Sequence, residues 1–196
     1  MATDITAFPI QNLKTTELTT ASTLDGTEAV DVVQSSTTRQ TTIADIETYI
    51  SEQRKGFAQY YMVGNSTVTS ISTTGVFVKV AGTTTQGEAP DNFNLTDNRA
   101  TYTQSTTAKF KVTGLLTFTS GGNNSIEVRV AKNGVTQARG TQAVETGGSG
   151  NAENVVVKDV VELSSATDYI EIFVANATDT GDVTVVDLMV VIERLA

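Results

Sequence analysis

The strongest constraint on the fold of this chain is a change in hydrophobic pattern near residue 56. Before that point the sequence is polar, rich in Thr, and has few regularly spaced apolar residues. After it, apolar and polar residues alternate in short runs that continue to the last residues. Alternation with a period of two places apolar side chains on one face of a β-strand. The pattern predicts an N-terminal arm, residues 1–55, followed by an all-β domain, residues 56–196.

Turn-forming residues divide the second part into short segments. Asn133-Gly134 is the sharpest of these signals, because this dipeptide suits the two-residue turn of a β-hairpin. Many short strands without a second helix predict a two-sheet sandwich or jelly roll. We expect strands over residues 57–63, 76–83, 100–104, 109–119, 125–132, 135–144, 154–163, 169–176 and 183–193.

The arm contains one hairpin signal and one helix signal. Residues 29–34 and 39–41 read as a small hairpin, and residues 42–54 read as a helix. Asp45 stands three residues after Thr42, the spacing of a capping box. Ile43, Ile46 and Ile50 form one apolar stripe. A helix this short is marginal alone, so the stripe must be covered either by its own hairpin or by two other copies of the chain.

Composition excludes most catalytic chemistry. The chain has no His, no Cys and no Trp, so Ser-His and Cys-His nucleophile pairs and thiolate zinc sites are excluded. Its net charge of −9 opposes binding to nucleic acid and to anionic membranes. The acidic loops 25–28 and 179–182 are explained by turn chemistry. We therefore expect no cofactor, no metal site and no enzymatic activity.

Carboxylates leave one catalytic alternative open. A glycosidase needs two of them about 5–10 Å apart in a cleft, and the candidates are Glu162, Glu171 and Asp187. They fall on separate predicted strands, where we expect each to lie on a solvated or subunit-facing surface. The longest apolar run, residues 183–192, contains Asp187 and is too short to cross a bilayer. The N-terminus lacks the pattern of a signal peptide, so we expect synthesis in the cytoplasm.

Aromatic residues supply candidate contacts between subunits. Tyr169 and Phe173 fall on the outward face of strand 169–176, whose core face is Ile170, Ile172 and Val174. Exposed aromatics on a sheet favour contact with another subunit. For each aromatic, packing within the chain is the alternative.

Two parts of the chain resemble proteins of tailed-bacteriophage particles. The runs LDGTEAVDVVQ (24–34) and TRQTTIADI (38–46) resemble an N-terminal module of many phage virion proteins. The β part resembles the C1q/TNF-like jelly roll of phage fibre heads and accessory capsid proteins. The carrying segments are VKVAGTT (78–84), NRATYT (98–103), FKV (110–112), KNG (132–134), DYIEIFVAN (168–176) and TVVDLMVVI (184–192).

This resemblance implies a non-enzymatic homotrimer, made in the bacterial host cytoplasm and carried on the virion. Because the predicted helix and head are nearly adjacent, it implies a capsid decoration or short head fibre, docked to a capsid or tail protein through its arm. The alternative is a tail-fibre head that recognises a host surface glycan. The expected anchor residues are Phe8, Pro9, Leu24, Val30, Val32 and Val33. The expected trimer contacts are Ile43, Ile46, Ile50, Tyr60, Tyr61, Tyr169 and Phe173.

Overall fold

The computed structural model describes residues 27, 29–34, 37–54 and 56–195. The chain divides into two compact units, Met1–Gln53 and Arg54–Ala196. Each unit is described here by itself.

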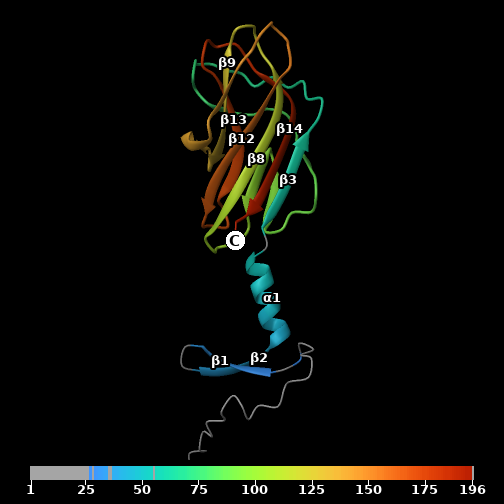
Figure 1. The fold of residues 1–196 in the computed structure, drawn as a ribbon, viewed down its shortest axis with the longest axis vertical. Helices are drawn as coiled ribbons and strands as arrows, with labels where there is room; N and C mark the ends of the chain where they lie inside the picture. The colour runs from blue at the N-terminus through green and yellow to red at the C-terminus, as the bar shows by residue number, and fades with distance from the viewer. Residues whose placement is uncertain (1–26, 28, 35–36, 55, 196) are drawn as a thin grey trace, which may run out of the picture. The chain divides into compact units, whose positions relative to one another are not determined.

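The N-terminal unit holds the predicted hairpin and helix. Strand β1 (Ala29–Gln34) pairs antiparallel with β2 (Thr37–Thr42), which begins two residues earlier than predicted. Helix α1 (Ile43–Arg54) follows directly (Figure 1). The capping box is confirmed. The backbone amide of Asp45 donates to the Thr42 hydroxyl at 3.1 Å, and the Thr42 amide donates to the Asp45 carboxylate at 3.1 Å. The Thr42 hydroxyl also donates to the Asp45 carboxylate at 2.7 Å, and this bond, followed by the one from the Thr42 amide, lowers the pKa of Asp45.

The second unit is a sandwich of two antiparallel sheets. One sheet has the order β12-β8-β14-β3-β5, and the other has the order β10-β9-β13-β7-β6, with β11 also on β9 and β4 also on β13. The bounds are β3 Phe57–Met62, β4 Val78–Lys79, β5 Thr85–Gln86, β6 Phe93–Thr96, β7 Arg99–Tyr102, β8 Ala108–Thr119, β9 Ser125–Lys132, β10 Val135–Thr136, β11 Gln142–Glu145, β12 Glu153–Leu163, β13 Tyr169–Asn176 and β14 Thr184–Arg194.

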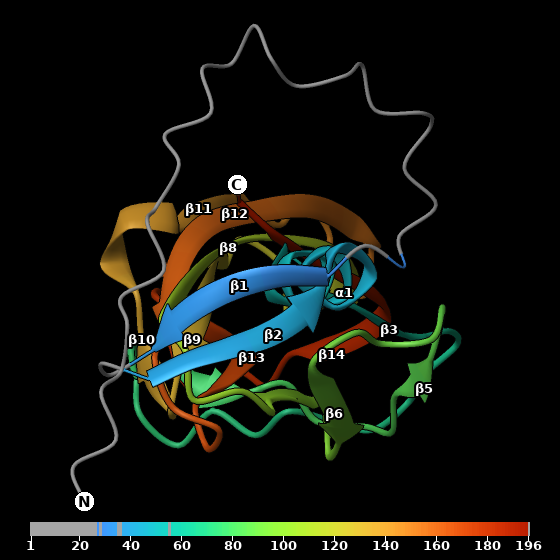
Figure 2. The ribbon, with the colours of Figure 1, turned by 90° about the horizontal axis from the view of Figure 1, so that it is seen from below.

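The pairing in the sandwich is nested. Strand β3 pairs with β14, β7 with β13, β8 with β12, and β9 with β11. This is the pairing of one long antiparallel ribbon whose two arms are rolled together. The roll is closed where β14 pairs with β8 and β13 with β9. Such a ribbon is a jelly roll, as the strand spacing predicted. Figure 2 shows β9 and β10 at one side of the sandwich and β5 and β6 at the other.

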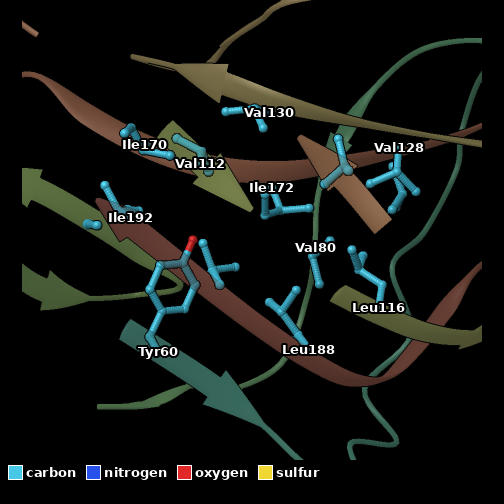
Figure 3. Packing of buried hydrophobic residues seen from close by; sticks show 14 of the residues in the cluster. Tyr60, Val80, Val112, Leu116, Val128, Val130, Ile170, Ile172, Leu188 and Ile192 are labelled. Atoms are coloured by element: carbon cyan, nitrogen blue, oxygen red, sulfur yellow. The ribbon is translucent and has the colours of Figure 1, made fainter. Parts of the chain in front are cut away.

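The core fills the space between the sheets. Val112 and Leu116 of β8 and Ile192 of β14 face Val128 of β9 and Ile172 of β13 (Figure 3). The predicted core face Ile170, Ile172 and Val174 is buried. Phe93, Tyr102 and Phe110 form an aromatic cluster, with ring centroids 5.1 to 5.5 Å apart. This continuous apolar interior gives the sandwich its own hydrophobic core.

Three strand predictions differ from the structure. Only Val78–Lys79 of the predicted strand 76–83 is paired, and β5 and β6 were not predicted. The predicted strand 135–144 is broken by a 3₁₀ turn, Ala138–Gly140. A Cβ at Gly140 would clash with the Lys158 carbonyl oxygen, so this turn packs directly on β12. These segments lie at the ends of the sandwich, where the loops that join the strands determine the path of the chain.

Candidate subunit interface

An apolar row crosses the outer face of the sheet β12-β8-β14-β3. Leu115 on β8 is directly opposite Val156 on β12 and Met189 on β14, and Met189 is in turn opposite Tyr61 on β3. Neighbouring strands bring these side chains together because their registers align. We call Tyr61, Leu115, Val156 and Met189 the apolar row.

The apolar row is exposed on the single chain. Tyr61 is 38% exposed, Leu115 40%, Val156 45% and Met189 37%. Val63, just beyond β3, is 77% exposed and extends the surface. These residues line a shallow groove of about 450 Å³. A contiguous apolar surface on one sheet face is typical of a protein–protein contact.

Strand alternation explains why these residues point outward. On β8 the inward set includes Phe110, Val112 and Phe118, all fully buried. The alternate residues of β8, from Lys109 to Thr119, face away from the core, and on most sandwich surfaces such positions are polar. Leu115 departs from this rule, and Met189 on β14 departs from it in the same row. The sheet therefore has apolar residues on both faces at this level.

Charged residues follow the apolar row on the same face, with the exposed Val160 of β12 among them, opposite Lys111. Lys111 pairs with Glu193 at 3.1 Å, two cross-strand rows away from the apolar row. Lys109, Lys158 and Arg139 border a second, wider groove of about 840 Å³. At the opposite end of the row, Asp187 accepts a hydrogen bond from the amide of Gly64 at 2.9 Å, beside a bulge in β14. The apolar row thus lies between two polar ends.

Tyr60 and Tyr61, both predicted to be subunit contacts, face opposite sides of the sheet. Tyr61 belongs to the apolar row, but its neighbour Tyr60 points into the core and is 1% exposed. The prediction of a subunit contact for Tyr60 is therefore corrected, because successive residues of a strand face opposite sides. Burial, with the negative charge of Glu171, raises the pKa of the Tyr60 phenol far above its ordinary value.

Tyr169 and Phe173 lie on the other sheet, away from the apolar row. The guanidinium of Arg99 stacks over the Tyr169 ring at 3.9 Å. Phe173 is half-buried and lies opposite Lys79 and Arg129 on its neighbouring strands. Their predicted role in a trimer stays a prediction, and the structure does not bring them together with Tyr61.

The three carboxylates of the glycosidase alternative do not form a pair. Glu171 was expected on a surface, but it is 2% exposed and is held by Lys79 and Arg99, each at 3.1 Å. Glu162 on β12 lies opposite Lys109 on β8. Asp187 on β14 lies opposite Thr117, which is eight residues further along β8. At the rise of a strand this is roughly 26 Å, too far for acid and nucleophile to act on one bond.

The predicted anchor residues fall partly outside the described chain. Val30, Val32 and Val33 lie on β1, whereas Phe8, Pro9 and Leu24 lie outside the described residues. In the part of the chain that the structure describes, no cluster of three potential metal ligands occurs. Among the same residues, α1 is too short and too polar to span a membrane.

The described fold is similar to solved jelly rolls of the tumour necrosis factor type. Eiger TNF from S. frugiperda is 14% identical, with a TM-score of 0.46, covering 72% of this chain and 94% of that one. Murine APRIL is 10% identical, with a TM-score of 0.45 and coverages of 70% and 98%. Rabbit GITRL is 13% identical, with a TM-score of 0.36 and coverages of 71% and 94%. No protein-family model and no curated protein sequence matches the chain.

The strand order itself defines an all-β jelly-roll sandwich, and a short helix precedes it in the sequence.

Proposed function

We propose that this chain is a structural, non-enzymatic protein that acts as a homotrimer on a tailed-phage particle. The observation that carries self-association is the apolar row Tyr61, Leu115, Val156 and Met189 on the outer face of one sheet. Covering this row removes large apolar side chains from water, which is the main favourable term in most protein association.

A second copy of the chain is the occupant that best suits this surface. The row is followed on the same face by both signs of charge, Lys111 and Glu193 among them. A surface of this kind can meet a complementary surface of an identical chain without leaving one sign of charge in excess. The C1q/TNF-like resemblance of the jelly roll supports an assembly of three copies, because closed rings of such heads are trimers.

The virion role is supported by the N-terminal resemblance. The segments LDGTEAVDVVQ and TRQTTIADI match a module of phage virion proteins in order and spacing. In this proposal the arm binds a capsid or tail protein, and the jelly roll projects as a decoration or short head fibre. Three anchors joined in one trimer bind at high effective concentration, so each single anchor need only be weak.

Native mass in solution tests the first part of the proposal. A trimer of the 20.7 kDa chain has a mass of about 62 kDa. A monomer at micromolar concentration would overturn the assembly.

Co-sedimentation with phage particles tests the anchor. A variant that begins at Thr42 keeps the helix cap and the whole jelly roll, and we expect it to remain trimeric but not to bind particles. The matched control is the full chain. Retained binding by the shortened protein would overturn the anchor assignment, and binding of the shortened protein to host cells would favour a receptor-binding head.

A further inference from the structure

Helix α1 has an apolar seam with the spacing of a coiled coil. Ile43, Ile46 and Ile50 are separated by three and then four residues, which are positions a, d and a of a heptad. We propose that α1 forms a short, parallel, three-stranded coiled coil with α1 of two further copies. This inference rests on the trimer proposed above and gives it a second contact surface.

The seam stays partly open among the described residues of its unit. Ile50 is 44% exposed, and Ile43 and Ile46 are only half-buried. Among the described residues, β1 pairs with β2 along its whole length. The partly exposed isoleucines of α1 therefore leave apolar surface that another helix can cover.

The residue type at the seam selects the number of helices. Isoleucine at both a and d positions packs better in trimers than in dimers, because the branched side chain at d fits the hole of a three-stranded core. All three described seam positions are Ile. The next d position in the sequence is Gln53, so the isoleucine seam ends at Ile50. The seam thus indicates three copies.

Chain connectivity supplies the affinity that the short helix lacks. Two heptads are marginal as an isolated coiled coil. However, only residues 55 and 56 separate the end of α1 from β3, the strand that carries Tyr61 of the apolar row. Heads that assemble through this face therefore hold three helices on short tethers, at high effective concentration. In a closed threefold assembly the copies are related by rotation about one axis, so their helices run in the same direction.

The cysteine-free chain allows a direct test in the full-length protein. Ile50→Cys places a thiol in the seam, and Ala44→Cys places one on an exposed position of the same helix outside the seam. Both variants are oxidised mildly, and their native mass and disulfide-linked species are measured. A disulfide requires Cα atoms within about 7 Å, which seam positions satisfy and outer positions do not.

We expect both variants to have the mass of a trimer. In Ile50→Cys, one disulfide can join two of the three chains, so up to two thirds of the chains should be in disulfide-linked dimers. Ala44→Cys is expected to link at least about tenfold less under the same conditions. A trimeric mass with equal linking in the two variants would overturn the coiled coil and leave the head trimer standing. A monomeric mass before oxidation would overturn both proposals. Should Ile50→Cys weaken folding, Ile46→Cys gives the same comparison at the d position.

Discussion

Leu115 on β8 lies directly opposite Met189 on β14, with both side chains on the outer face of the sheet and 40% and 37% exposed. This pair is the centre of the apolar row, and Tyr61 and Val156 complete it on the flanking strands. It places an apolar surface on the outside of the sandwich, so we expect the proposed assembly to be most sensitive to substitution here.

Leu115→Glu is expected to disrupt self-association without unfolding the domain. An unpaired carboxylate in the middle of a buried contact is costly, so the midpoint concentration of assembly should rise about 100-fold or more. Analytical ultracentrifugation measures this shift, and circular dichroism confirms the fold. The control is Val135→Glu, an exposed position on β10 of the other sheet. Equal effects of both substitutions would show that the apolar row is not the contact.

Asp168→Asn should reduce stability at neutral pH. Asp168 accepts from the Ser164 amide at 2.8 Å and the Asn133 side chain at 2.8 Å, and Lys132 pairs with it at 3.0 Å. Burial alone would raise its pKa, but these partners lower the pKa to about 2. A shift of this size is worth about 2 kcal/mol of unfolding free energy above the ordinary pKa, near 4.

The stability that Asp168 contributes depends on pH. Because the folded pKa lies below the unfolded one, the contribution of Asp168 is fully present above about pH 5 and is lost as pH falls toward 2. Urea unfolding at several pH values is the measurement. The difference between wild type and Asp168→Asn should shrink across that window, whereas Glu88→Gln, at an exposed position, should change little. A constant difference at all pH values would contradict the assignment.

Glu171→Gln should cost more than the same change in an exposed ion pair. Glu171 is buried beneath Lys79 and Arg99, so the substitution leaves two cations without their shared anion. We expect a loss of about 1–3 kcal/mol, less than for a fully buried pair because both cations are partly in solvent. The matched control is Glu193→Gln, whose partner Lys111 is exposed and whose loss should be under about 1 kcal/mol. Denaturant unfolding compares the two; equal losses would contradict the prediction.

Gly114→Ala should destabilise the sandwich because the core has no room for a methyl group. A Cβ there would lie 2.9 Å from Cγ1 of Val157 and 3.3 Å from Cδ1 of Ile172. Overpacking of this kind costs about 1–3 kcal/mol. The double variant Gly114→Ala with Val157→Ala should lose less than the sum of the single losses, as measured by thermal unfolding. Strict additivity would show that the two positions do not compete for space.

The sequence predicted the strands whose two faces differ clearly. Residues 125–132 and 169–176 have the predicted bounds, and the capping box of Thr42 and Asp45 has both predicted bonds. Asn133 and Gly134 take the positive φ angles, 52° and 75°, that the hairpin turn requires. These features depend on neighbours in the sequence. Strands β5 and β6 were missed because short edge strands have few residues in which a pattern can develop.

The candidate interface could be predicted only in part. Tyr61, one of the expected trimer contacts, lies in the apolar row, but Leu115, Val156 and Met189 were not among the expected contacts, and Tyr60, which was, is buried in the core. The row arises from the registers of three strand pairs, and a shift of one residue in any of them would move a member to the core. Periodicity within a strand carries no information on which residue of the next strand lies beside it.

By itself, the sequence determined the division into arm and β domain, the all-β class and the lack of His- and Cys-based chemistry, because periodicity and composition are local properties of the chain. Only the tertiary structure decided which apolar side chains remain outside. The nested pairing of β3 with β14 and β8 with β12 aligns Tyr61, Met189, Leu115 and Val156, and it buries Glu171 under two cations. Contacts between strands far apart in sequence depend on register and closure of the roll, which are set by the whole core at once.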